Sequence, residues 1–110
     1  MGWISLFTGS GRRERMQWIA RQLAETCEAD VWDRIERRIA TMPLGEARGY
    51  VRARARSVVR RTVEVYESRL TKGPADTDQL LASTTDHVVS RVMGTIALRR
   101  AATAAQRRAA

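Results

Sequence analysis

The sequence is poor in the residues on which catalytic and metal sites depend. Its 110 residues include one histidine, His87, and one cysteine, Cys27. A single chain therefore cannot supply a histidine-based triad, a histidine-rich metal site or an internal disulfide. The seven glycines are scattered, and none forms a strand-to-helix phosphate loop. We predict a non-enzymatic protein that holds no cofactor and no metal ion.

Long apolar runs and targeting signals are also missing. No stretch approaches the roughly 20 apolar residues that span a bilayer. The first ten residues lack the charged start and the cleavage site of a secretory signal. A lone cysteine is typical of a reducing compartment, so we expect a cytoplasmic protein in which Cys27 is a small buried hydrophobe.

Acidic residues are outnumbered by basic ones. Twenty Lys and Arg residues against twelve Asp and Glu residues give a net charge of +8 and an isoelectric point near 11.3. This excess suits an anionic partner such as nucleic acid or a membrane surface. Nineteen of the twenty basic residues are arginine and alanine is abundant, as expected of a GC-rich genome. The net charge therefore informs function, whereas the preference for arginine over lysine does not.

Helical periodicity dominates the rest of the chain. After Pro43, apolar residues recur at helical spacing as far as Leu70, and residues 12–41 and 76–98 show the same pattern. The segment Thr71-Lys72-Gly73-Pro74 reads as a helix stop. We predict an all-α fold, an antiparallel three-helix bundle, which becomes a four-helix bundle if the first helix, capped by Ser10, breaks near Asp30.

Two ends of unlike composition flank this single bundle domain, which we place at residues 12–98. Residues 1–11 form a short apolar N-terminal arm that we expect to fold over a groove of its own bundle or of a neighbouring chain. Residues 99–110 form a basic Ala/Arg-rich C-terminal tail with little to bury, so we expect a frayed or solvated helix there.

A ladder of arginines lies within residues 44–70. The ladder consists of Arg48, Arg52, Arg56 and Arg60, which repeat every four positions. Like charges at this spacing lie about 6 Å apart, which is unfavourable without a nearby anion. If the chain reverses at Pro43, facing residues of the hairpin have numbers that sum to about 85. Acids of the first helix would then neutralise the ladder. The expected pairs are Arg52 with Asp33, Arg56 with Glu28 and Asp30, and Arg60 with Glu25; Arg48 begins the same ladder.

The leading functional hypothesis is binding to the phosphate backbone of nucleic acid with little sequence specificity, because no base-reading motif is present. Candidate contacts are the arginines left unpaired by the hairpin and those of the basic tail. They are Arg48, Arg54, Arg61, Arg99, Arg100, Arg107 and Arg108. The sequence does not distinguish DNA from RNA.

The alternative is a structural or adaptor protein that acts as a helical homo-oligomer. Trp18 and Trp32 lie two heptads apart, and this line either faces the third helix of the same bundle or forms an oligomer interface. The arm residues Trp3 and Phe7 would bind a protein partner. The same arm, followed by arginines, also suits peripheral contact with an anionic membrane.

Overall fold

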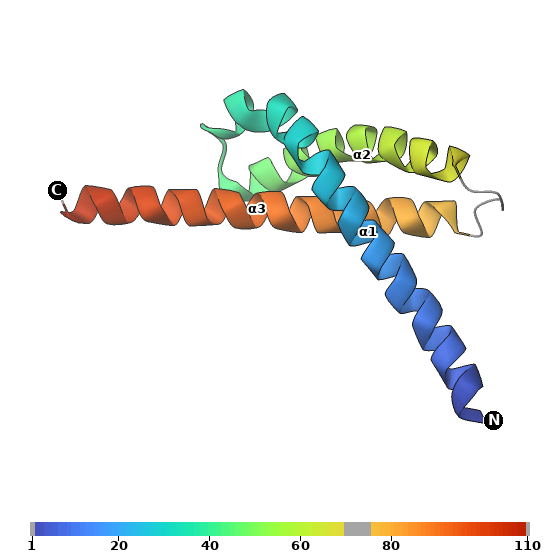
Figure 1. The fold of residues 1–110 in the computed structure, drawn as a ribbon. Helices are drawn as coiled ribbons and strands as arrows, with labels where there is room; N and C mark the ends of the chain where they lie inside the picture. Colours follow the sequence, from blue (N-terminus) through green and yellow to red (C-terminus); the bar gives the residue numbers. More distant parts are fainter. Residues whose placement is uncertain (1, 70–75, 110) are drawn as a thin grey trace.

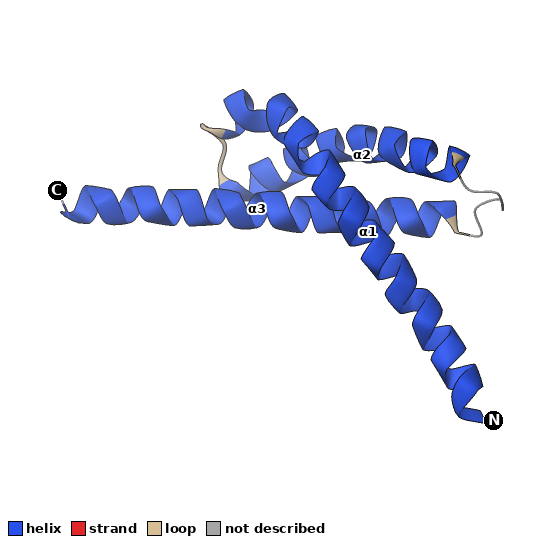
Figure 2. Ribbon diagram, viewed as in Figure 1, coloured by secondary structure: helices blue, strands red, loops and turns tan. Residues whose placement is uncertain are grey.

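The chain folds into three long helices, as the periodicity predicts (Figure 1). A computed structural model describes the backbone of residues 2–69 and 76–109, and the side chains of these ranges from residue 11 onward. Helix α1 spans Gly2–Ile39, α2 spans Leu44–Ser68 and α3 spans Thr77–Ala109. Within these ranges there is no strand (Figure 2). The predicted stop at 71–74 lies outside the described residues.

The three helices pack against one another in every pairwise combination. Helices α2 and α3 lie side by side and antiparallel, and α1 crosses them obliquely (Figure 1). The first turns of α1 and the last turns of α3 project beyond this packed centre. The molecule is accordingly flat and elongated, with extents of 64 × 31 × 19 Å. The fold class is therefore the predicted all-α three-helix bundle.

The first helix corrects two expectations. Residues 2–11 continue the helical backbone of α1 away from the bundle, so they do not fold back as an arm over a groove (Figure 1). Ser10 lies inside the helix and does not cap it. The helix also runs unbroken through Asp30, which excludes the four-helix alternative. An acid can occupy a helix interior at small cost, so its cap potential alone does not end a helix.

The second and third helices begin near the predicted positions. Pro43 precedes α2 with φ −59°, and its carbonyl accepts the first helical hydrogen bond from Ala47 N at 2.9 Å. Helix α3 begins at Thr77, and Asp76 accepts from Leu80 N at 3.0 Å. The tail predicted to be frayed or solvated is helical to Ala109 and mostly exposed.

The core consists mainly of small and β-branched residues. Each helix contributes one apolar stripe, with Ile35, Val51 and Val92 fully buried at its centre. Cys27 is also fully buried, as predicted. No aromatic side chain from residue 11 onward, among those described, is fully buried. Because the stripes are narrow, a wide surface remains on each helix for polar and charged groups.

Candidate functional site

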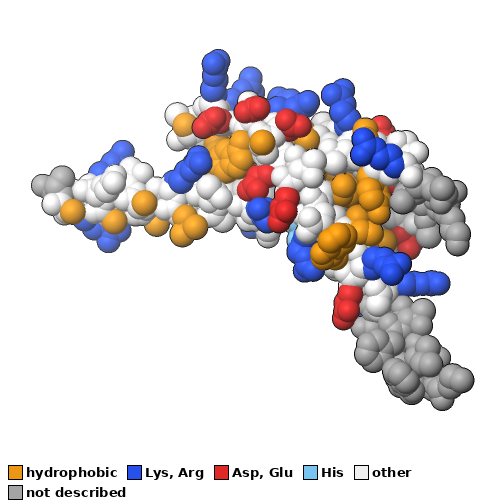
Figure 3. All heavy atoms as spheres, in the orientation of Figure 1, with side chains coloured by type: hydrophobic (Ala, Val, Ile, Leu, Met, Phe, Trp, Pro, Cys, Tyr) orange, Lys and Arg blue, Asp and Glu red, His pale blue; other side chains and the backbone are white. Residues whose placement is uncertain are grey.

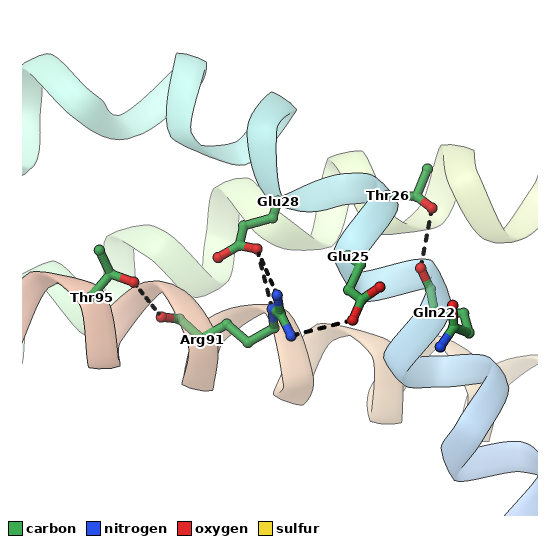
Figure 4. Close-up of polar contacts among 6 residues, drawn as sticks. All are labelled: Gln22, Glu25, Thr26, Glu28, Arg91 and Thr95. Atoms are coloured by element: carbon green, nitrogen blue, oxygen red, sulfur yellow. Dashed lines mark hydrogen bonds and ion pairs between the residues drawn. The ribbon is translucent and has the colours of Figure 1, made fainter.

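Some arginines are used to hold the helices together. Arg91 of α3 donates from Nε and Nη2 to Glu28 Oε2 of α1, at 3.2 and 3.1 Å, and its Nη1 lies 3.8 Å from Glu25 Oε1 (Figure 4). Arg52 of α2 donates to Asp86 Oδ1 of α3 at 2.9 Å. These contacts join α3 to each of the other two helices.

Arg100 has a different structural role. Its Nη2 donates to the carbonyl oxygens of Ile39 and Met42, at 2.8 and 2.7 Å. These carbonyls lie at and just after the C-terminal end of α1, where the helix dipole attracts a cation; Ile39 O also accepts from Met42 N at 3.1 Å. Arg100, predicted as a phosphate contact, is therefore half-buried and already bound to the end of another helix.

The predicted stitching between the ladder and α1 is wrong. Arg52 pairs with Asp86 instead of Asp33, and Arg91 takes Glu28 and Glu25, two of the three acids assigned to Arg56 and Arg60. The hairpin register itself is close to the predicted sum of 85.

Two contacts show this register: Tyr50 donates to the Arg34 carbonyl at 3.4 Å, and Thr62 lies at the Cys27 thiol. The error concerns the side of α2 on which Arg52 lies. Successive residues turn by 100°, so Arg52 is about 200° from Tyr50 around α2 and faces α3.

Four arginines consequently remain on the outer side of α2. Arg54, Arg56, Arg60 and Arg61, here called the outer arginines, are all exposed, and none forms an ion pair with another described residue. The guanidinium of Arg54 lies 5.3 Å from the centre of the Tyr50 ring. In Figure 3, basic and acidic side chains both lie along the upper edge of the molecule, which the end of α1 and α2 form. Arg56 also lines a hollow with Asp78 and Asp86 of α3, whereas Arg54, Arg60 and Arg61 face solvent and are open to an external anion.

The predicted phosphate contacts do not form one cluster. Arg52 meets Asp86 in the antiparallel α2–α3 pair, so Arg61 lies level with the start of α3. Arg99 is 22 residues further along α3, or roughly 33 Å away at 1.5 Å per residue. Arg107 and Arg108 lie beyond it on the projecting end, and Arg48 lies near the first turn of α2. The candidate residues therefore divide into an α2 group and an α3 group.

Three residues of the α3 group, Arg99, Arg100 and Arg107, border a hollow of about 490 Å³ between the last turns of α1 and α3. Arg99 stacks on Trp32, with its guanidinium carbon 4.7 Å from the ring centre. Arg107 lines the same hollow, whereas Arg108 does not. The complete lining is Trp32, Glu36, Ile39, Ala40, Ile96, Arg99, Arg100, Thr103, Ala104 and Arg107. We call this hollow the Trp32 pocket.

The two tryptophans predicted to form one line face different surroundings. Trp32 packs against the core and against Arg99 of α3, in agreement with the third-helix alternative. Trp18 is 57% exposed. A straight α-helix drifts by about 20° per heptad, so two heptads move Trp18 out of the line. Trp3 and Phe7 lie in the helical backbone of α1, and their side chains are outside the described range.

Other reactive groups are engaged within the bundle. His87 Nε2 lies 2.8 Å from Gln17 Oε1, which links α3 to α1. Burial is the main cause that raises the pKa of the Cys27 thiol, with Asp30 adding to it and Thr62 acting against it. In residues 2–69 and 76–109, no three His, Cys, Asp or Glu side chains form a metal-sized group. No helix of these ranges is long and apolar enough to cross a membrane.

Comparison with protein-family models, curated proteins and solved structures gave no match. The arrangement of charged groups in this chain therefore carries the functional argument alone.

Sequence reasoning missed three residues that the structure brings to the candidate surfaces. Arg56 and Arg60 were assigned to the hairpin, and Glu36 was not among the candidate residues. A helical-wheel comparison of Tyr50 with the ladder offers a signal for the first two, because it separates the two flanks of α2. Glu36 carries no comparable signal, since its place in the Trp32 pocket depends on how α3 extends past α1.

Proposed function

We propose that this protein binds the phosphate backbone of nucleic acid through the outer arginines of α2, with little sequence specificity. One observation carries the proposal: four exposed guanidinium groups lie on two successive turns, and no described acid pairs with them. Glu25 and Glu28 of α1 are turned toward Arg91, so these two acids do not neutralise this face. The net charge of +8 adds a long-range attraction to polyanions.

The residues available favour contact with the backbone over readout of bases. Arginine binds phosphate oxygens through several N–H donors, and such contacts carry no sequence information. Tyr50, the nearest aromatic residue, is half-buried and bonded to Arg34 O, so it offers no free stacking platform. We therefore expect binding to duplexes of unrelated sequence with similar affinity.

The salt dependence of binding tests this proposal. The full-length protein is titrated with a labelled duplex between about 50 and 200 mM salt. We expect the variant with Arg54, Arg56, Arg60 and Arg61 changed to Gln to bind at least about tenfold more weakly. Its log–log slope should flatten by about 0.9 for each phosphate that the variant no longer neutralises.

The matched control removes the same charge from another surface. Arg12, Arg13, Arg15 and Arg21 of α1 are also exposed, and changing them to Gln lowers the net charge equally. If both variants show the same fall in affinity and in slope, the attraction comes from net charge alone and the assignment to α2 fails. No binding of the unmodified protein at low salt would contradict nucleic-acid binding altogether.

An acid of α2 on this face supplies a test with the opposite sign. Glu64 is exposed and lies four residues after Arg60, one turn along α2. Its carboxylate repels phosphates that approach the outer arginines. The Glu64→Gln variant should therefore bind the duplex more tightly, whereas a loss of affinity would argue that phosphates approach elsewhere.

A second candidate function, self-association, rests on Trp18. This side chain is 57% exposed and borders a shallow hollow with Gly11, Arg15 and Arg21 on the projecting part of α1. Tryptophan is a frequent anchor of protein interfaces. Sedimentation velocity of the protein and of Trp18→Ala tests this candidate. It predicts a concentration-dependent oligomer that the variant does not form, and a monomer at all concentrations would contradict it.

A further inference from the structure

The Trp32 pocket forms because α3 extends past the C-terminal end of α1. Residues Ile96, Arg100, Thr103 and Arg107 follow one another at i, i+4, i+7 and i+11, which places them on one stripe of α3. Earlier in α3 the same stripe packs against the other helices. Helix α1 ends at Ile39, so the continuation of the stripe stays uncovered beside the last turns of α1.

The pocket is cationic. Arg99, Arg100 and Arg107 line it against a single acid, Glu36. Arg100 is held by two neutral carbonyl oxygens, so its positive charge is oriented without being neutralised. Both N–H groups of its Nη2 serve these carbonyls.

The remaining donors of Arg100, Nε–H and the two of Nη1, have no partner among the described residues. A half-buried guanidinium with three unused donors is suited to an incoming oxyanion.

The pocket also offers a surface for a flat ring. The planar guanidinium of Arg99 covers Trp32 on one side, and Arg99 itself is exposed, which leaves its other side open. Nucleobases stack on guanidinium planes as well as on aromatic rings. The volume of about 490 Å³ is within the usual range of about 300–1,000 Å³ for small-molecule sites.

We infer that the Trp32 pocket binds a nucleotide unit, a planar base that carries a phosphate. The base stacks on Arg99, and the phosphate lies between Arg100 and Arg107. This unit comes from one of two sources, a free nucleotide or the 5′-phosphorylated end of a strand. The inference does not rest on the outer arginines, because the pocket and α2 use different residues.

Nuclear magnetic resonance of the ¹⁵N-labelled full-length protein tests the inference, with adenosine 5′-monophosphate as the probe. We expect a saturable shift of the Trp32 indole N–H signal with a dissociation constant in the millimolar range or tighter. The Trp18 signal serves as an internal control and should not move. Adenosine and inorganic phosphate, each of which lacks one half of the probe, should bind more weakly.

Neighbouring arginines provide matched variants. Arg107→Gln removes a charge from the pocket, and Arg108→Gln removes the same charge next to it. We expect the first to weaken binding of the probe about threefold to tenfold and the second to change it by less than about twofold. Glu36→Gln should tighten binding. These exposed positions make no hydrogen bond with another described side chain, so the variants should fold.

The outcomes separate the two sources and include a refutation. A 5′-phosphorylated single strand that binds more tightly than both the probe and the same strand without phosphate assigns the pocket to strand ends. Equal or tighter binding of the probe assigns it to free nucleotides. The inference is overturned if neither moves Trp32 saturably, if inorganic phosphate alone binds as well, or if Arg107→Gln and Arg108→Gln behave alike. The variant that lacks the outer arginines should bind the probe normally. Failure of this inference and failure of the duplex-binding proposal can therefore be told apart.

Discussion

The contact between α1 and α3 and the outer side of α2 use the same residue type in opposite ways. At the α1–α3 contact, Arg91 and Arg100 bind carboxylates and carbonyl oxygens of the protein itself. On α2, the outer arginines face solvent with no acidic partner among the described residues. Arginine content alone therefore does not locate a binding surface, because the partner of each guanidinium decides its role.

The largest expected effect on stability lies at Arg100. Changing Arg100 to Gln removes charged donors from Ile39 O and Met42 O at the end of α1, and hydrogen bonds to charged groups contribute about 1.5–3 kcal/mol each. Since the site is half-buried, we expect a loss of about 1–3 kcal/mol in urea unfolding. Arg108→Gln is the matched control and should stay within about 0.5 kcal/mol. Equal stability of the two variants would show that Arg100 does not stabilise the fold.

A smaller loss is expected at Arg91. Its ion pairs with Glu25 and Glu28 are partly exposed, and exposed pairs contribute about 0.2–1 kcal/mol. Arg91→Gln should destabilise the fold by that amount, and less in high salt. A double-mutant cycle with Glu28→Gln measures the coupling between the two side chains. A coupling energy of zero would show that this contact adds nothing to stability.

A substitution on the outer side of α2 should hardly change the free energy of unfolding in the same assay. Arg60 forms no ion pair with another described residue, so Arg60→Gln should change the free energy of unfolding by less than about 0.5 kcal/mol. Thermal and urea unfolding measure this directly. A loss as large as that of Arg91→Gln would mean that Arg60 takes part in the fold, which would erase the contrast between the two regions.

Most of the fold followed from the hydrophobic pattern, because narrow stripes at helical spacing can be buried only by packing helices together. The start of α2 after Pro43, the start of α3 at Thr77 and the burial of Cys27 are examples. The extent of α1 did not follow. Ser10 and Asp30 have good capping side chains, yet a helix continues through such residues when its neighbours favour it.

The candidate surfaces were predicted less well than the fold. Linear register placed Arg52 beside Asp33, but the turn of 100° per residue puts it on the α3 side of α2. The Trp32 pocket depends on the relative lengths of α1 and α3, which no local pattern encodes. The arginines of the basic tail were recognised from composition, although the binding of Arg100 to the end of α1 was not.

The contribution of Cys27 to stability depends on pH only under alkaline conditions. Burial raises the pKa of its thiol above the ordinary value of 9.0, so the folded state keeps its proton at a pH where the unfolded chain loses it. The stability that this provides is complete below pH 9.0 and is lost as the pH rises further. The free energy of unfolding, measured with urea at increasing pH, should decline more steeply for the native protein than for Cys27→Ala. Parallel declines would contradict a buried neutral thiol.

The most direct test of the contrast follows individual arginine side chains while a short duplex is added. In spectra of the Nε–H groups, we predict that signals of Arg54, Arg60 and Arg61 shift in proportion to the bound fraction. The Arg91 signal should stay in place, because its donors are held by Glu28. Shifts of Arg91 with unmoved signals from α2 would contradict the account, since the duplex would then be bound by the arginines that hold the helices together.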